Sequence, residues 1–553
     1  MKPSTIISAL FVVVAIVLAL GEFLFFDRMT SKHHAWVFPR WNDQSYYLTQ
    51  AYQGYENVKA RGLITGLRET LARPTAQGVM HEVSATLVFW LVGSASRSAA
   101  LSLNMLAFIA WQLALLLAFR RAGQAWALGW MGFGLLLCIF WPWSAEAGSA
   151  IDFRLDHAAM CLFGVCGAFA LLTQGWRSTR YSALLGVAIA VTLLERFLTG
   201  VYFAALFIAS IGWILLGPEK AARLRNLALT GFIVLLLAGP VFWAYRAMIV
   251  QYYWVGQVTG AEAAARAPGF DGWQSLKFVA TYATQAQLGD LFWRAAGWLT
   301  VTLAGLSLLI RFAFRRPLIR IIDWDWLFFG LAFLILPGIV LCLNKQKSHV
   351  VLGILAPGFV LLLGWLWAAL WPRPVKDPAR PGFDWSLLTV APAVGILLAG
   401  GSFFKGRLLW QPHDARFQAN AREVNQVTGR MYATIRQAGR TSFRLGVDQV
   451  TDFFDPETIR VIGFERGQGD ISPQCMLPVG ILELSEEFIY RQLKQCDFVM
   501  LTDEGGAGTW PYDRQMQRLH PQIKAWCIEN MRLREDLVLF NRHLSLYQRR
   551  DLP

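Results

Sequence analysis

Long, uninterrupted stretches of apolar residues constrain this chain more than any other feature. A helix needs about 20 mostly apolar residues to cross the hydrocarbon core of a bilayer. Eleven segments approach that length, and the charged pair Glu195-Arg196 divides one long run into two of them. The predicted spans are 5–26, 98–119, 124–143, 157–173, 181–194, 198–216, 227–245, 292–310, 326–343, 350–371 and 386–403. We therefore expect an α-helical polytopic membrane protein with about 11 transmembrane helices, followed by a soluble C-terminal α/β domain.

Composition agrees with a membrane protein. Of the 553 residues, 55% are hydrophobic and 16% are charged, whereas soluble domains average about 25% charged residues. These values exclude a disordered chain and a purely soluble enzyme. The formal net charge of +14 would favour nucleic acid in a soluble protein, but membrane topology accounts for most of it, so we expect no nucleic-acid partner.

The basic residues predict the orientation, because Lys and Arg gather in short cytoplasmic loops. With a cytoplasmic N-terminus, the short outer turns hold only Arg154, Arg196, Lys345 and Lys347. The inner segments hold many more: Lys2, Arg120, Arg121, Arg177, Arg180, Lys220, Arg223, Arg225, Arg311, Arg315, Arg316, Arg320, Arg373, Lys376 and Arg380. The first span reads as an uncleaved anchor, and an odd number of spans places the C-terminus outside. We expect a bacterial inner membrane protein with a periplasmic C-terminal domain.

Two domains are predicted, 1–403 in the membrane and 404–553 outside it. The membrane domain carries two long outer loops, 27–97 and 246–291, and the apolar stretch Leu87–Val92 in the first indicates a helix lying in the interface. The outer domain alternates helical and strand-like patterns, which is typical of a small α/β fold. We expect helices over 414–437, 485–494 and 512–530, strands over 443–447, 460–464 and 498–502, and a closing hairpin of 537–540 with 544–547.

Ionisable residues at the outer face are candidate functional groups, because charges at membrane depth are costly. Asp43, in the aromatic sequence Trp41-Asn42-Asp43-Gln44-Ser45-Tyr46-Tyr47, can act as a general base if it reaches an acceptor hydroxyl or amine. The alternative is an ordinary loop aspartate. Arg154 and Asp156, at the start of the fourth predicted span, either contribute to a site or form an interfacial ion pair.

Two further charged turns are candidates. Glu195-Arg196 either caps a helix or lines a cavity. Lys345, Lys347 and His349 lie in an outer turn, where a lysine ammonium suits a phosphate as a point charge or simply extends to lipid headgroups. His33-His34 lacks the spaced partners of a metal site, and Gly505-Gly506-Ala507-Gly508 lacks the residues of a nucleotide loop. Among Cys475, Cys496 and Cys527, at most one disulfide can form.

The order of these features resembles the GT-C superfamily of membrane glycosyltransferases, in particular the branch of protein O-mannosyltransferases and the lipid A aminoarabinose transferase. Asp43 with Tyr46, Tyr47 and Ala51 is similar to the first-loop motif of that family. Further likenesses are Phe89-Trp90-Leu91-Val92-Gly93, Arg154-Leu155-Asp156, and Lys347 ten residues before Pro357. The chain departs from the pattern at Asn42 and Gln44, where the family often has a second acid, and at 350–354.

The resemblance implies a glycosyltransferase that moves a sugar from a polyprenyl-phosphate carrier to a lipid, glycan or protein acceptor of the cell envelope, with inversion. Asp43 and Asp156 are then the expected catalytic residues. Arg154, Arg196, Lys345 and Lys347 are expected to bind the donor phosphate, with Glu195 and His349 as possible additions. Nothing in the sequence requires a nucleotide cofactor, and a divalent metal is left open.

Two other functional classes fit a chain of this type. A transporter or flippase for a lipid-linked sugar would also have many spans and buried charges, but such proteins often carry repeated halves, and this sequence shows none. A noncatalytic scaffold of an envelope assembly would use the C-terminal domain as a binding module. Turnover of a polyprenyl-phosphate sugar would separate the first class from both.

Overall fold

The structure is a computed structural model that describes most of the chain. The described residues are 3–33, 43–73, 75–144, 147–259, 272–313, 323–343, 349–371, 415–438, 443–448, 454–469, 471–475, 485–503 and 514–552.

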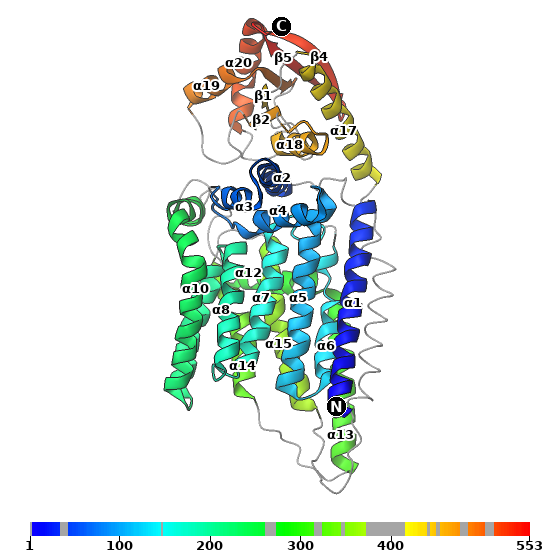
Figure 1. The fold of residues 1–553 in the computed structure, drawn as a ribbon, viewed down its shortest axis with the longest axis vertical. Coiled ribbons are helices and arrows are strands. Elements are labelled where there is room, and N and C mark those ends of the chain that lie inside the picture. The colour runs from blue at the N-terminus through cyan, green and yellow to red at the C-terminus, as the bar shows by residue number, and fades with distance from the viewer. Residues whose placement is uncertain are drawn as a thin grey trace.

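A bundle of long helices forms the larger part of the molecule (Figure 1). In the described residues, eight helical segments are long and apolar enough to cross a membrane, and the chain is an integral membrane protein. The helices that form these segments are α1 (Pro3–His33), α5 (Arg97–Gly123), α7 (Leu155–Leu172), α9 (Thr199–Leu216), α10 (Lys220–Ile249), α12 (Gly272–Thr281) with α13 (Gly289–Ala313), α14 (Trp324–Leu343) and α15 (Ala356–Leu370).

Each of the eight segments overlaps one predicted span, but the predicted number of eleven is not reached in the described residues. The predicted span 124–143 contains α6 (Trp126–Leu136), which is too short to cross, and the buried turn η1 (Trp141–Trp143). The predicted span 181–194 is α8 (Thr179–Glu195), a helix of 17 residues. The predicted span 386–403 lies outside the described residues.

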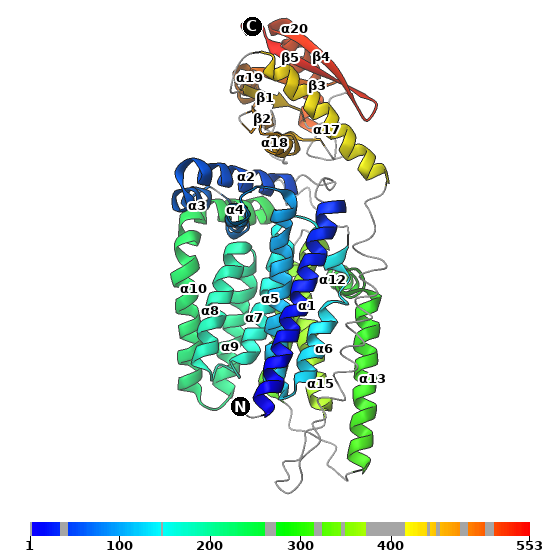
Figure 2. The same ribbon diagram turned by 45° about the vertical axis from the view of Figure 1, so that its right-hand side comes forward.

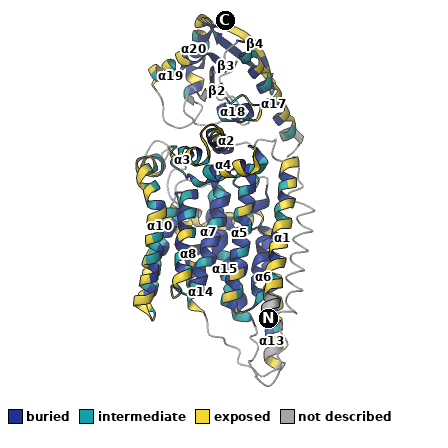
Figure 3. Cartoon of the chain, viewed as in Figure 1, coloured by how far each residue is buried: buried dark blue, intermediate teal, exposed yellow. Residues whose placement is uncertain are grey.

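Burial distinguishes central from peripheral helices (Figure 3). α7 is the most buried of the candidate spans and packs against α5 and α8, whereas α10 is largely exposed. The exposed side chains of the outer helices are apolar, as at Val17 of α1 and Leu235 of α10. An apolar surface of this kind is stable only against lipid or another apolar partner.

Three helices of the first outer loop lie across one end of the bundle: α2 (Asp43–Arg61), α3 (Leu63–Leu71) and α4 (Met80–Val92) (Figure 2). α4 includes the predicted interfacial stretch Leu87–Val92. α2 is too polar to lie in lipid, and its acidic first residue and basic last turn complement the helix dipole. We call these three helices the interfacial layer.

The second long outer loop is also mostly helical where it is described. α10 continues into η2 (Val250–Thr259), and η3 (Tyr282–Leu288) joins α12 to α13. A further short helix, η4 (His349–Leu355), leads into α15.

The C-terminal part contains a five-stranded sheet in the order β2-β1-β3-β5-β4. β1 (Phe443–Val447) pairs in parallel with β2 (Ile471–Cys475) and β3 (Phe498–Thr502), and β5 (Arg542–Arg549) pairs antiparallel with β3 and β4 (Met531–Leu539). The helices of this part are α17 (Ala415–Arg436), α18 (Pro456–Glu465), α19 (Glu486–Gln495) and α20 (Arg514–Asn530). Cys496 and Cys527 are buried, free thiols. The expected domain boundary at 403/404 lies outside the described residues.

The predicted strand 460–464 is wrong, because these residues belong to α18. Its β-branched residues indicated a strand, but the Asp455 carboxylate caps the helix by accepting from the Glu457 and Thr458 amides, and Pro456 suits a first helical turn. β2 was not predicted. The predicted hairpin is present, and its turn is Phe540-Asn541, both with positive φ, as a two-residue turn requires.

α18 joins the C-terminal part to the interfacial layer (Figure 1). Glu465 accepts hydrogen bonds from Arg97 Nε at 2.8 Å and from the Tyr52 hydroxyl at 3.1 Å. The Tyr52 ring stacks on Phe464, with ring centroids 5.7 Å apart. Ser45 and Thr458 share a buried hydrogen bond of 3.1 Å. α2 is therefore held from above by the C-terminal part and from below by α4.

We predict that Glu465→Ala weakens this docking. The change removes the carboxylate that Arg97 and Tyr52 share, and a hydrogen bond to a charged group contributes about 1.5–3 kcal/mol, less here because Glu465 is partly exposed. The thermal midpoint of the purified protein in detergent should fall, and proteolysis between the two parts should become faster. Glu529→Ala, at an exposed glutamate of the same domain, is the control. A Glu465→Ala protein as stable as this control would contradict the docking role.

Candidate active site

Asp43 is the first residue of α2, and its carboxylate lies at the edge of the interfacial layer. Oδ2 is 3.1 Å from Arg154 Nη1, and the Asp43 side chain is 58% exposed. The following residue, Gln44, is buried, and its Oε1 accepts from the Phe153 amide at 3.1 Å. The start of α2 is thus fixed to the segment that precedes α7, and Asp43 keeps access to solvent.

Arg154 lies immediately before α7, and its side chain is only 9% exposed. Its Nε is 3.0 Å from Asp152 Oδ2, so two carboxylates balance one buried guanidinium. The Gly148 amide donates to Asp152 at 2.6 Å, and the Asn104 side chain donates to the Asp152 carbonyl. Burial raises the pKa of Asp152 to about 6, and Arg154 and the Gly148 amide oppose that shift.

Arg196 follows α8 directly and pairs with Asp156 on the first turn of α7, with Nη2 3.2 Å from Oδ1. Arg196 also donates to the side-chain oxygen of Gln77, which accepts from the Tyr47 hydroxyl at 2.6 Å. Gln77 Nε2 donates to the Tyr252 hydroxyl at 3.0 Å. The side-chain amide of Gln77 therefore links Arg196 to Tyr47 of α2 and to Tyr252 of η2.

These pairs form one electrostatic cluster at the ends of α7 and α8 that adjoin the interfacial layer. Arg154 interacts with Asp43, Asp152 and Asp156. Tyr47 interacts with Arg196, Asp43 and Asp156, although burial is the main cause that raises its pKa far above the usual value. The predicted residues Asp43, Arg154, Asp156 and Arg196 thus lie close together, as a shared site would require.

A pocket with one charged and one apolar side adjoins this cluster. Asp156 and Arg196 form its charged side, with Thr199 and Tyr202 of α9. Val350, Val351 and Ile354 of η4 line it as well. Such a pocket suits a ligand that has a charged head group and an apolar tail.

Glu195 has a different partner from its neighbour Arg196. Its Oε1 is 2.6 Å from His81 Nδ1 on α4, and both side chains are almost fully buried. Two backbone bonds hold the same turn, from Val79 N to Leu194 O and from Phe197 N to Gln77 O. In this structure Glu195 fixes the turn that carries Arg196 and does not line the pocket.

The late outer turn is only partly described. Lys345 and Lys347 lie outside the described residues, and for His349 the backbone at the start of η4 is described but the side chain is not. Their roles stay predictions. Val350, three residues after Lys347, lines the pocket beside Arg196.

Sequence reasoning missed Gln77, His81 and Asp152 as parts of this site. Asp152 lies two residues before Arg154, which was selected from the sequence as a candidate. A carboxylate so close to that arginine could have been recognised as its partner. Gln77 and His81 carried no signal, because their roles depend on contacts with residues more than 100 positions away in the chain.

Comparison with known proteins gives a match at the level of structure only. The sequence matches no protein family profile and no curated protein. The apo crystal structure of ArnT from Cupriavidus metallidurans superposes with a TM-score of 0.54 at 15% identity, covering 99% of this chain and 98% of that one. ArnT is a lipid A aminoarabinose transferase with the GT-C fold. This chain has the GT-C fold.

Two more distant structures were also found. The Archaeoglobus fulgidus oligosaccharyltransferase in the apo form gives a TM-score of 0.44 at 12% identity, over 88% of this chain and 69% of that one. The mycobacterial arabinofuranosyltransferase AftD gives 0.47 at 13% identity, over 97% and 39%. The match to ArnT carries the assignment of the GT-C fold, including the membrane helices and the small C-terminal domain.

We predict that the Glu195–His81 pair stabilises the protein in a pH-dependent way. Burial lowers and the Glu195 carboxylate raises the pKa of His81, and the net shift is upward from about 6.5. The stabilisation is then complete below pH 6.5 and is lost as pH rises through the higher folded-state pKa. Glu195→Gln should lower the thermal midpoint more at pH 6 than at pH 9.

The control for this experiment is Glu56→Gln, at an exposed pair with Lys59 on α2. Exposed pairs contribute about 0–1 kcal/mol, so this variant should match wild type at both pH values. An equal loss for Glu195→Gln at pH 6 and pH 9 would show that His81 is neutral in the folded protein.

Proposed function

We propose that the protein is a glycosyltransferase that moves a sugar from a polyprenyl-phosphate carrier to an acceptor of the cell envelope. The GT-C fold supports a membrane enzyme of this kind. The observation that carries the proposal is the clustering of Asp43, Arg154, Asp156 and Arg196 beside a pocket that is charged on one side and apolar on the other. Such a pocket suits a lipid phosphate, and the adjacent exposed carboxylate suits a base.

In the proposed reaction, an acceptor oxygen or nitrogen attacks the anomeric carbon of the donor. The bond between that carbon and the carrier phosphate breaks, and its electron pair leaves with the phosphate. The acceptor proton passes to Asp43. Attack from the face opposite the phosphate inverts the anomeric centre.

Two guanidinium groups are available to stabilise the leaving phosphate. Arg196 and Arg154 are held by ion pairs before any substrate arrives, so they need little reorganisation during the reaction. Lys345 and Lys347 would add charge from the adjoining turn. Asp156 holds Arg196 in place in this proposal.

The cluster would face the outer side of a bacterial inner membrane, with the N-terminus in the cytoplasm and the C-terminal domain in the periplasm. The distribution of Lys and Arg supports this orientation. The acceptor would then be a lipid, glycan or protein of the envelope.

Turnover by the purified protein tests the proposal directly. Protein in detergent or in vesicles is incubated with radiolabelled polyprenyl-phosphate sugars, and release of the sugar from its carrier is measured with and without envelope extract. A transferase should release the sugar. A flippase would move the intact donor across vesicles without breaking the bond, and a scaffold would do neither.

We predict that Asp43→Asn lowers the rate of transfer by about 10²–10⁴, the usual cost of losing a general base. The amide keeps the size and polarity of the side chain but does not accept the proton. The measurement is kcat for sugar transfer by the purified variant. Glu56→Gln removes an exposed carboxylate of the same helix and should leave kcat unchanged. Near wild-type transfer by Asp43→Asn would refute the assignment and make Asp156 the next candidate.

We predict that Arg196→Ala weakens use of the donor roughly ten- to a hundredfold in kcat/KM, since a charge-assisted contact contributes about 1.5–3 kcal/mol and 1.36 kcal/mol corresponds to tenfold. Lys347→Ala should act in the same direction. Arg68→Ala, at an exposed arginine of α3, is the control and should match wild type. If a folded Arg196→Ala protein kept wild-type kcat/KM, Arg196 would have no part in binding the donor phosphate.

A further inference from the structure

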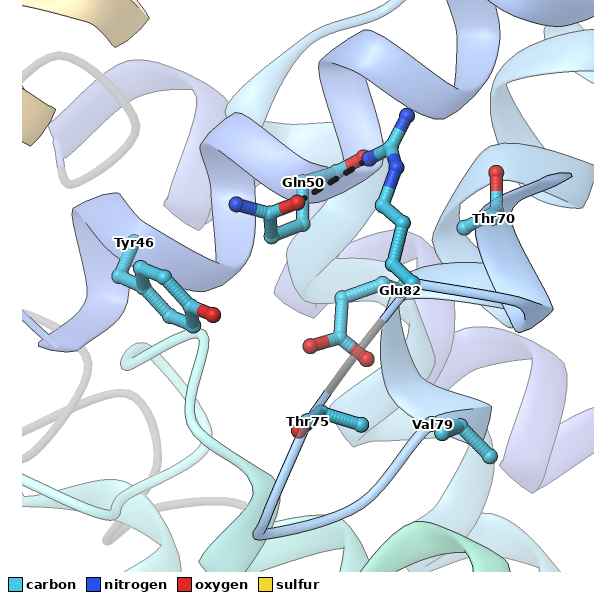
Figure 4. A pocket seen from close by; sticks show the side chains of 7 residues that line it. Tyr46, Gln50, Thr70, Thr75, Val79 and Glu82 are labelled. Atoms are coloured by element: carbon cyan, nitrogen blue, oxygen red, sulfur yellow. Dashed lines mark hydrogen bonds between the residues drawn. The ribbon is translucent and has the colours of Figure 1, made fainter. Parts of the chain in front are cut away.

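A second pocket lies in the interfacial layer (Figure 4). Tyr46 and Gln50 of α2 line it, together with Arg73, Thr75 and Glu82. Thr75 and Val79 face this pocket, whereas Gln77 between them binds Arg196. The two pockets therefore share one wall.

Glu82 forms the closed end of this pocket. Its side chain is 6% exposed, and its Oε2 is buried without a hydrogen-bond partner among the described residues. Figure 4 shows the carboxylate pointing into the pocket from α4. An acceptor of this kind is costly to leave unsatisfied, so the site is built to receive a donor group.

Arg73 lines the same pocket and attracts Glu82 electrostatically without forming an ion pair with it. Its guanidinium donates to the Gln50 carbonyl at 2.6 Å and to Gln50 Oε1 at 3.2 Å. Within the described residues, no ion pair of 4.0 Å or less joins it to Glu82. The pocket lined by the Glu82 carboxylate and the Arg73 guanidinium has a volume of about 20 Å³, which holds a group the size of one hydroxyl or one water.

The combination of Glu82 with Arg73 in one pocket favours one chemical class of ligand. A phosphate only accepts hydrogen bonds and would be repelled by Glu82, and an ammonium group only donates and would be repelled by Arg73. A hydroxyl both donates and accepts, so it can pair with both side chains. The Tyr46 hydroxyl also both donates and accepts, whereas Gln50 Oε1 already accepts from Arg73 and the Thr75 hydroxyl already donates to the Gly78 carbonyl. Burial raises the pKa of Glu82 to about 7, so near neutral pH its carboxyl can act in either role.

We infer that this pocket receives a hydroxyl group at the edge of a sugar ring of a glycan acceptor. The inference rests on the proposed function. The position of the pocket agrees with this role, because Tyr46 lines it and is three residues after Asp43. The two residues therefore lie on the same face of α2, within about 5–6 Å at the Cβ atoms. An acceptor ring here would present a hydroxyl toward Asp43, while the donor phosphate occupied the pocket at Arg196.

Binding of simple sugars tests the pocket without requiring turnover. The probes are methyl glycosides of glucose, galactose, mannose and arabinose, with methyl phosphate and cyclohexylamine for comparison, observed by saturation-transfer NMR against the full-length protein in detergent. At least one glycoside should give a signal that falls at least tenfold in Glu82→Gln and in Tyr46→Phe. Glu56→Gln, the matched control on α2, should keep it. Asp43→Asn should also keep it, so failure of the base assignment is distinguishable from failure of the pocket.

Turnover distinguishes an acceptor ring from the ring of the donor. With a labelled polyprenyl-phosphate sugar, transfer to a glycan acceptor and release to water are measured in the same reaction. An acceptor site predicts that Glu82→Gln lowers the ratio of transfer to release at least tenfold. A proportional fall in both would place the donor sugar in the pocket and overturn the inference. So would a glycoside signal that Glu82→Gln leaves intact, the absence of any glycoside signal, or binding of methyl phosphate or cyclohexylamine that Glu82→Gln abolishes.

Discussion

The arrangement of this molecule depends on the pairing of two buried arginines at the end of the helix bundle that carries the interfacial layer. A buried guanidinium without a partner would cost several kcal/mol, so each must be matched by carboxylates that reach it. Arg154 takes Asp43 and Asp152, and Arg196 takes Asp156. These partners come from α2, the turn before α7 and α7 itself. The ion pairs therefore set where the interfacial layer rests on the transmembrane helices.

α2 connects this cluster to the rest of the chain. It is too polar to lie in lipid or to cross the bilayer, so it is stable only between two protein surfaces. On one side it meets α4 and the arginine cluster, and on the other it meets α18 through Ser45, Tyr52 and the Glu465 carboxylate. The C-terminal domain is consequently part of the structure that positions Asp43.

The sequence predicted the features that depend on local composition. Apolar length identified the eight candidate spans of the described residues, and short strand-like runs identified β1 and β3. Hydropathy failed at 124–143, because an apolar segment buried in protein resembles one that faces lipid. The strand predicted over 460–464 was wrong, because the Asp455 side chain caps a helix there. β2 carried no apolar pattern.

The site was predicted in the same partial way. Asp43, Arg154, Asp156 and Arg196 could be selected because charges are rare near membrane spans, and the structure brings them together. Their pairing could not be predicted, because Arg154 joins a residue 111 positions away. The role of Gln77 and the partner of Glu195 depend on contacts of the same long range. Composition therefore identified the charges, and only the fold specifies which carboxylate each arginine holds.

The charge of the cluster constrains how a phosphate could bind there. Two guanidinium groups face three carboxylates, Asp43, Asp152 and Asp156, so the described cluster is not positively charged near neutral pH. A donor phosphate that approached Arg196 would meet Asp156 at the same time. Two arginines held in this way can orient a phosphate, but additional positive charge is needed to make its entry favourable. Lys345 and Lys347 precede the η4 residues that line the pocket, and we expect them to supply this charge. If they do, the late turn would contribute net attraction for the donor, and the buried arginines would contribute its orientation.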